Sequence, residues 1–508
     1  MKDESGQRLR ARCDDLPREI FVELGLAIKR ASPFRYTMIA ELVNRAVLLV
    51  CLLAAPAAAD DFKAGAAIVD ITPPVGWRKA GGYDEVISTG IHDPLYAKAL
   101  VFEQGEQRAA FVFCDLTGIS RRVADRARSA ASEATGIPIA HIAILATHTH
   151  GAPEYHGVLW EIWHRRSLEQ KGRDDTAPID YQAFLAERWV QAIQNAWAAR
   201  KPVRLEAGIA YQPDLAFNRR YHMKDGTVRF NPGKKNPDII RPAGPVDTEL
   251  PILLLRDAGD GKPLYSLTVF AMHVATFFKD GQLSADFPAV MQRRLRAKLG
   301  PNLISVFGEG TAGDVNHFDV YSAAPQPGDT EPERIGSRLA ETILKKIPEL
   351  KPVAAPSLAV LSEKVPAPLQ EVTAEQIERA EAVLSGKLTS TPALMLQVEA
   401  YRILHTRDFR RWFGDAIPME VQAFRLGTDT AIVTLPHEIF AELGLAIKQA
   451  SPFKQTFVIS LANDVDWYVP TRKAFAEGSY EVATCPVKAG AGEMLVESAV
   501  RLLKQLKP

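Results

Sequence analysis

The feature that most constrains this chain is a regular alternation of short apolar runs with longer amphipathic stretches. Apolar runs of strand length occupy residues 95–102, 109–114, 142–146, 264–272 and 303–307. Helical patterns lie among them at residues 120–134, 181–199 and 286–299. The last of these has Asp286 as its predicted N-cap, Pro288 in its first turn and Gly300 as its stop. Since alternating helices and strands bury their apolar faces against one another, we predict a layered α/β fold.

Proline marks a predicted division of this fold. Residues 348–368 are rich in proline and are predicted to link two lobes. Beyond them, residues 373–413 are predicted to be mostly helical, and the strand–helix pattern resumes at Gln422.

The N-terminal part of the chain is predicted to lie outside the fold. Residues 38–59 combine a positively flanked apolar run at 46–55 with an Ala-x-Ala site that ends at Ala59, as in a secretory signal peptide. The apolar run is too short to cross a bilayer, and a buried N-terminal helix is the alternative. Cleavage after Ala59 would leave residues 60–508 as one large catalytic domain, in a secreted or periplasmic protein.

A second N-terminal feature is a repeat. Residues 16–34 match residues 435–453 except at Arg18/His437, Val22/Ala441 and Arg30/Gln449. Two copies so far apart do not form a repeat architecture, which needs several adjacent units. We therefore interpret residues 1–37 as a duplicated, non-functional remnant of the C-terminal segment. A second half-site is the alternative, but the copy lacks the other candidate residues.

Composition excludes several classes of function. The chain carries 61 Lys+Arg and 61 Asp+Glu, and it has no basic stripe, so nucleic acid is not an expected partner. Its cysteines are Cys13, Cys51, Cys114 and Cys485, which are too few for a disulfide scaffold or a Cys-rich zinc module. Whether Cys114 pairs with Cys485 is left open. Any metal must be held by histidine, carboxylate or phenol side chains.

Candidate ligands follow the predicted strands. His148 and His150 come directly after the apolar run 142–146, and in extended backbone both imidazoles would project to one face. His273 follows the run 264–272, and Glu438 is predicted to open a helix after another strand. Imidazole suits zinc, but a His-x-His pair is also a common structural pair, so spacing leaves both interpretations open.

Several motifs together carry a resemblance to a known family. They read Gly-Ile-His-Asp-Pro-Leu-Tyr-Ala-Lys-Ala-Leu at 90–100, Cys-Asp-Leu at 114–116, Thr-His-Thr-His at 147–150, Gly-Asp-Val-Asn at 313–316 and Tyr-Val-Pro-Thr-Arg at 468–472. In this order, across residues 65–481, they closely resemble the catalytic domain of neutral/alkaline non-lysosomal ceramidases and their bacterial relatives. The resemblance implies a layered, mixed-sheet catalytic domain.

The resemblance also implies the site residues. A catalytic Zn2+ would be held by His148, His273, Glu438 and Tyr468, a mixed nitrogen and oxygen shell that zinc accepts. For Tyr468, the alternative is a core or rim tyrosine.

Three further residues would act beside the metal, namely His150 facing the substrate, Arg219 near the scissile amide, and Tyr480. For Arg219, a surface salt bridge is the alternative.

The implied activity is zinc-dependent hydrolysis of the amide bond of an N-acylated lipid, such as N-acylsphingosine, by a metal-activated water. The expected partner is this lipid or another small-molecule amide; peripheral membrane contact is left open, and no protein partner is evident.

The chain is expected to depart from the family in four places. Asn316 replaces a serine, and so does Gly151, which follows His150. Residues 154–173 are this chain's own, and the 28 residues after Tyr480 leave no room for an immunoglobulin-like domain. Hydrolysis of another amide or ester, and a catalytically silent binding protein, are therefore kept as alternatives.

Overall fold

The computed structural model describes residues 62–508 except 278, 280, 325, 327–329 and 386–392. The predicted remnant (1–37) and the predicted signal peptide (38–59) lie outside the described residues. Residues 60–508 cluster as one compact unit. Within it, Cys114 and Cys485 are both buried and both free thiols.

The larger of two main sheets has mixed strand directions. Its main path runs β16 (Ile304–Glu309), β14 (Pro263–Phe270), β13 (Glu249–Asp257), β8 (Lys201–Tyr211), β1 (Lys63–Asp70), β5 (Tyr96–Gln104), β6 (Gln107–Cys114) and β7 (Ile142–Ala146), and β18 (Lys351–Pro352) pairs with β8. The pairs β6–β7 and β14–β16 are parallel, whereas the other neighbours along this path are antiparallel. One strand of each parallel pair ends just before a candidate site residue: β7 ends before His148, and β14 ends before His273.

The second sheet packs against the first. It runs β19 (Ala359–Pro368), β20 (Ala416–Arg425), β21 (Thr430–Thr434) and β23 (Gln455–Ile459), with β21 and β23 parallel. Phe111 and Phe113 of the large sheet share one apolar cluster with Phe424, Ile432 and Phe457 of the small sheet. The two sheets therefore face each other across a common core.

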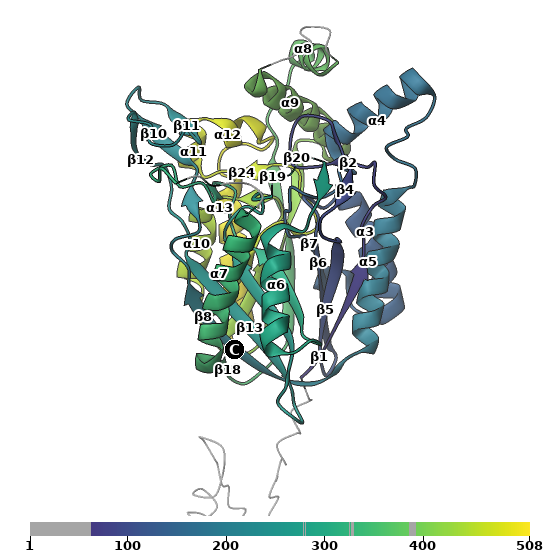
Figure 1. The fold of residues 1–508 in the computed structure, drawn as a ribbon, viewed down its shortest axis with the longest axis vertical. Helices are drawn as coiled ribbons and strands as arrows, with labels where there is room; N and C mark the ends of the chain where they lie inside the picture. Colours follow the sequence, from purple (N-terminus) through teal and green to yellow (C-terminus); the bar gives the residue numbers. More distant parts are fainter. Residues whose placement is uncertain (1–61, 278, 280, 325, 327–329, 386–392) are drawn as a thin grey trace, which may run out of the picture. The chain divides into compact units, whose positions relative to one another are not determined.

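The opposite faces of the same strands are covered by helices. Alternate residues such as Val112 on β6 and Val433 on β21 belong to separate outer clusters, because successive side chains of a strand point to opposite faces. Helices α3 (Arg121–Thr135) and α5 (Tyr181–Ala198) cover one region of the large sheet, and α6 (Asp286–Leu299) and α7 (Glu331–Lys346) cover another (Figure 1). Helices α10 (Ala441–Ala450) and α13 (Ala491–Leu506) cover the small sheet. The predicted layered α/β fold with a mixed sheet is confirmed.

The remaining elements lie mostly at one end of the sheets. Figure 1 shows α4 (Gly157–Lys171), α8 (Ala374–Leu384), α9 (Leu394–Phe413), α11 (Arg472–Glu477) and α12 (Tyr480–Thr484) at this end. The short strands are β2 (Arg78–Lys79), β3 (Val86–Ile87), β4 (Gly90–Ile91), β9 (Phe217–Asn218), β10 (Arg220–Met223), β11 (Val228–Phe230), β12 (Ile239–Pro242), β15 (Gln282–Leu283), β17 (Val315–Asn316), β22 (Glu438–Ile439) and β24 (Tyr468–Val469). The described residues also form 3-10 turns at Ile139–His141 and Ile347–Glu349. Among the described residues, no helix has both the length and the apolar character that crossing a bilayer requires.

Two local predictions were wrong. Residues 348–368 do not link two lobes, because most of them form β18 and the long strand β19 inside the two sheets. Asp286 is the first residue of α6 rather than its N-cap, which is Ala285. Its carboxylate accepts hydrogen bonds from the backbone N–H groups of Thr276 (2.7 Å) and Phe277 (3.0 Å), so it ties the loop after His273 to the helix.

Candidate active site

The first two candidate histidines follow β7 but do not sit in extended backbone. His148 has φ 67°, in the left-handed region, so the predicted extended geometry was wrong. The two imidazole rings nevertheless lie close together, with centroids 4.9 Å apart. A non-glycine residue held in this region signals that the surrounding structure imposes the conformation, as is common at functional sites.

Backbone carbonyls set the tautomer of each candidate histidine. Nδ1 of His148 lies 2.6 Å from the carbonyl of Thr117, and Nδ1 of His150 lies 2.9 Å from that of Gly81. Nδ1 of His273 lies 3.1 Å from the carbonyl of Ala312. A carbonyl only accepts, so each Nδ1 carries the proton and each neutral ring keeps its lone pair on Nε2.

These lone pairs converge on one point. Nε2 of His148 lies 3.2 Å from Nε2 of His273 and 3.4 Å from Nε2 of His150. The three rings form a group whose ligand atoms could all reach one metal ion. Two lone pairs facing each other at such distances are unfavourable unless a proton or a cation lies between them, so the arrangement fits a metal centre.

Two oxygen candidates come from one pair of short strands. β22 and β24 pair in parallel with Glu438 opposite Tyr468. Glu438 Oε2 lies 3.2 Å from His148 Nε2 and 3.1 Å from His273 Nε2, and the Tyr468 hydroxyl lies 3.4 Å from His273 Nε2. The prediction that Glu438 opens a helix was wrong, because α10 begins three residues later, at Ala441. The strand pairing instead delivers both side chains to the histidines.

The charges in this cluster also fit a bound cation. Burial would lower the pKa of His148, but the carboxylates of Glu438 and Glu309 raise it to about 9. Burial would raise the pKa of Glu438, but His148 and His273 hold it well below its ordinary value. The carboxylate therefore attracts one positive charge into the histidine cluster. A divalent cation satisfies the same demand.

Arg219 is buried beside the cluster rather than on the surface. Its side chain is 4 % exposed, so the surface salt bridge considered from the sequence was wrong. Nε donates to Glu481 (2.9 Å), Nη2 donates to the carbonyl of Gly313 (2.8 Å), and Nη1 lies 3.2 Å from His273 Nε2. Its guanidinium carbon lies 4.9 Å from the centre of the Tyr468 ring. The Arg219 charge thus lies at the edge of the ligand cluster.

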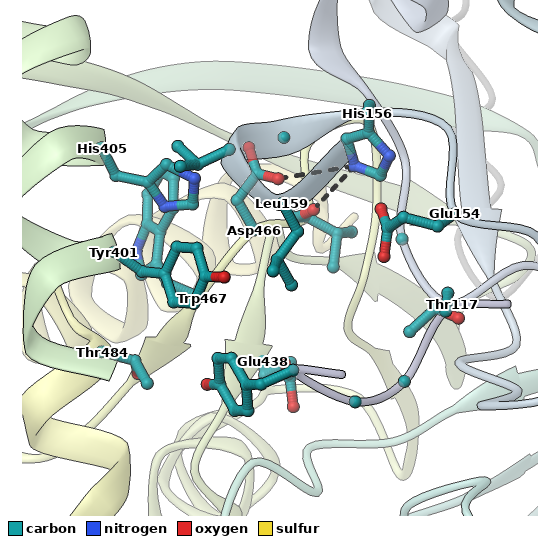
Figure 2. Close-up of a pocket in the computed structure, with 18 of the residues that line it drawn as sticks. Thr117, Glu154, His156, Leu159, Tyr401, His405, Glu438, Asp466, Trp467 and Thr484 are labelled. Atoms are coloured by element: carbon teal, nitrogen blue, oxygen red, sulfur yellow. Dashed lines mark hydrogen bonds and ion pairs between the residues drawn. The ribbon is translucent and has the colours of Figure 1, made fainter. Parts of the chain in front are cut away.

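Tyr480 is the first residue of α12 and lies beside Tyr468 at the site. Its hydroxyl lies 3.0 Å from the hydroxyl of Tyr83, and its ring packs against Tyr468 with centroids 5.6 Å apart. Burial raises the pKa of Tyr480, so its hydroxyl stays protonated at neutral pH. A pocket of about 190 Å³ opens beside it and is lined by His148, His150, Glu438, Tyr468 and Tyr480, among others. Figure 2 shows part of this lining, with Glu438 at its base.

Comparison with known proteins identifies the family. The sequence model described as neutral/alkaline non-lysosomal ceramidase, N-terminal, matches residues 62–316. The chain belongs to this family. It is therefore a hydrolase. No curated protein matches the chain.

Solved ceramidase structures share the fold. The neutral ceramidase from Pseudomonas aeruginosa superposes with a TM-score of 0.67 at 18% identity, over 88% of this chain and 75% of that chain. A structure described as ceramidase complexed with C2 superposes with a TM-score of 0.66, at the same identity and coverage. At this identity the comparison establishes the ceramidase fold alone.

The structure also places residues near the site that the sequence analysis missed. They are Tyr83, Thr117, Glu309 and Glu481, together with Gly81. Gly81 has φ 94°, and a Cβ there would lie 2.5 Å from Cβ of His150, so only glycine lets its carbonyl hold that ring. None of these positions forms a motif in the sequence, because each is defined by what it contacts across the fold.

Asn316, which the resemblance to the family predicted to replace a serine, lies on β17 and has partners of its own. Its Nδ2 donates to Asn231 (3.3 Å), and its Oδ1 accepts from the N–H of Phe318 (3.0 Å). The side chain is buried and lacks the hydroxyl that a covalent mechanism would need.

Proposed function

We propose that this ceramidase-family hydrolase is zinc-dependent and cleaves the amide bond of an N-acylated lipid, ceramide being the reference substrate, by attack of water. The observation that carries the proposal is the convergence of His148 Nε2, His273 Nε2 and Glu438 Oε2 within 3.2 Å of one another. Tyr468 is proposed as the fourth ligand. We further propose that the protein acts after export, as a secreted or periplasmic enzyme.

The donor set suits zinc. Imidazole, carboxylate and phenol ligands give the mixed nitrogen and oxygen shell that zinc takes in hydrolases. Zinc held by these residues would lower the pKa of water toward neutrality and supply hydroxide for attack on the amide carbonyl. The backbone carbonyls that hold Nδ1 of His148 and His273 fix the orientation of both rings before a metal binds.

Arg219 is proposed to stabilise the oxyanion that develops on the substrate. Its guanidinium stays charged, because Tyr468 and Glu481 outweigh the effect of burial and raise its pKa. The side chain is also held rigidly by Glu481 and by the carbonyl of Gly313. A preorganised cation of this kind costs no reorganisation when charge develops on the carbonyl oxygen.

His150 and Tyr480 are proposed to handle protons. Burial, together with His148 and His273, holds the pKa of His150 well below its ordinary value, so this ring is neutral at pH 7 and can accept a proton. The Tyr480 hydroxyl, hydrogen-bonded to Tyr83, can donate one to the departing amine. With Asn316 in place of serine, the nucleophile is water.

The test is to remove one ligand and count metal. We expect His148→Ala to lose both bound zinc and activity, because removing one of few ligands opens the shell to water. The measurement is elemental analysis of the purified protein together with amide hydrolysis, and chelation of the wild type should inactivate it reversibly. His141→Ala is a matched control, because His141 precedes β7 at the end opposite His148. Stoichiometric zinc in His148→Ala would refute the ligand assignment.

A further inference from the structure

A single loop contacts both side chains that are proposed to handle protons. Residues 80–85 join β2 to β3, and Gly81 and Tyr83 of this loop line the pocket. The Gly81 carbonyl lies 2.9 Å from Nδ1 of His150, and the Tyr83 hydroxyl lies 3.0 Å from the hydroxyl of Tyr480. The loop therefore connects two site residues that come from distant parts of the chain.

The β2 end of this loop is anchored to the segment that follows His150. The N–H of Ala80 donates to the carbonyl of Ala152 (2.8 Å), and the N–H of Glu154 donates to the carbonyl of Arg78 (2.8 Å). These backbone bonds hold the start of the loop against the histidine segment. The loop thus has a defined position that does not depend on a substrate.

Aromatic packing holds the ring of Tyr83 in place. The ring stacks on that of Tyr401, which α9 places on the pocket wall (Figure 2), with centroids 5.4 Å apart and an interplanar angle of 26°. It meets the Tyr480 ring edge-on, with centroids 6.5 Å apart. Both arrangements are favourable for aromatic rings. Because they involve the ring alone, Tyr83→Phe should keep the packing and remove only the hydroxyl.

The Tyr83 hydroxyl can assist the reaction through the oxygen of Tyr480. An alkylamine leaves readily only if its nitrogen gains a proton as the C–N bond breaks. When Tyr480 gives that proton, its oxygen gains negative charge and accepts a stronger hydrogen bond from Tyr83. Burial raises the pKa of Tyr83 well above its ordinary value, so its hydroxyl keeps the proton that this bond requires.

We infer that Tyr83 is a positioning residue, which holds the Tyr480 oxygen and supports it while Tyr480 protonates the leaving amine. In this step the C–N bond breaks, its electron pair stays on nitrogen, and nitrogen takes the Tyr480 proton. The attacking water forms the new C–O bond and supplies the proton that restores Tyr480. This inference rests on the proposed amide hydrolysis and adds a residue to it.

The first test is a double-mutant cycle with N-octanoylsphingosine on the zinc-loaded full chain. We expect Tyr83→Phe to lower kcat by about tenfold, with KM and zinc content unchanged. Tyr480→Phe should lower kcat by about 10²-fold or more. Adding Tyr83→Phe to that variant should lower kcat by about twofold at most, because the oxygen through which Tyr83 acts is gone. Tyr211→Phe is the matched control, because it removes a hydroxyl from a residue of β8 that is 62% exposed and does not line the pocket.

The second test changes the leaving group. The ester 4-nitrophenyl octanoate carries the same acyl group, but 4-nitrophenolate leaves without being protonated. We therefore expect Tyr83→Phe to hydrolyse this ester within about twofold of the wild-type rate, although it is slower on the amide. A purely structural role of Tyr83 would lower the unfolding temperature and would reduce both activities together.

Three results would overturn the inference and leave the proposed hydrolysis standing. They are amide hydrolysis by Tyr83→Phe at the wild-type rate, losses that add fully in the cycle, and an equal loss on the amide and the ester. If the wild type itself does not cleave the amide, the proposed hydrolysis fails and the inference fails with it.

Discussion

At the scale of single residues, the position of the ring proton on each histidine determines what the candidate centre can bind. Thr117, Gly81 and Ala312 each present a carbonyl to Nδ1 of one histidine, and this leaves three Nε2 lone pairs pointing at one another. Such an arrangement is stable only with positive charge at its centre. His150 Nε2 lies 3.4 Å from His148 Nε2. At this distance His150 could either bind the metal or face the substrate.

His150→Ala separates the two roles of this histidine. If the family assignment holds and His150 faces the substrate, we expect the variant to keep its zinc and to lose kcat by about 10²-fold or more. The reason is that His148, His273 and Glu438 remain as ligands while a proton carrier is removed. Zinc content and kcat are measured on the same preparation. Loss of zinc would instead favour chelation by all three histidines, the arrangement that the His-x-His spacing suggested.

At the scale of elements, helix α4 forms one wall of the pocket and is anchored by a buried ion pair. Arg78 on β2 donates from Nη1 to Asp174 (2.6 Å) and from Nη2 to Ser167 of α4 (2.9 Å). The side chains of Arg78 and Asp174 are 1 % and 2 % exposed. Burial alone would raise the pKa of Asp174, but hydrogen bonds from Arg78 and Thr176 hold it well below its ordinary value.

Asp174→Asn should destabilise the protein by about 1–3 kcal/mol, because it removes one of the two carboxylates that pair with the buried Arg78 charge and leaves only Glu85. The native pKa of Asp174 lies below its unfolded value of about 4, so the contribution is fully present above about pH 4 and is lost as the pH falls further. Urea unfolding of wild type and variant across this range measures the difference. A difference that stayed constant down to low pH would show that the ion pair is not its source.

At the scale of the whole molecule, the two facing sheets bring distant parts of the chain to one end. The site draws on loops after β7, β14 and β21 and on the start of α12, and the strands that carry them share the core between the sheets (Figure 1). The first described core residue of this unit is Phe62, which packs in that core. Residues 1–59 supply none of the candidate site residues.

Deletion of residues 1–37, or of residues 1–59, should therefore leave kcat/KM and zinc content unchanged. The repeated segment contains Glu19 at the position equivalent to Glu438 but has no companion histidine motif. The comparison uses amide hydrolysis and thermal unfolding of the full chain and both shortened chains. A shortened chain that unfolds like the full one but has lost activity would assign these residues a catalytic role.

Periodicity and motifs determined the layered α/β fold, the buried strands and the family, because these depend on local spacing along the chain. The sequence also selected His148, His273, Glu438 and Tyr468 as ligand candidates through motif resemblance, and that assignment remains to be tested. Only tertiary structure decided what surrounds them, such as the β22–β24 pairing that sets Glu438 opposite Tyr468. The prediction that the proline-rich segment links two lobes was wrong because it rested on local composition alone. β19 is an edge strand, where proline is tolerated, and it pairs with β20 along its whole length. The part of the pocket lined by α4, α9 and the loop before β24 likewise exists only where these elements meet, and no spacing in the sequence encodes that meeting.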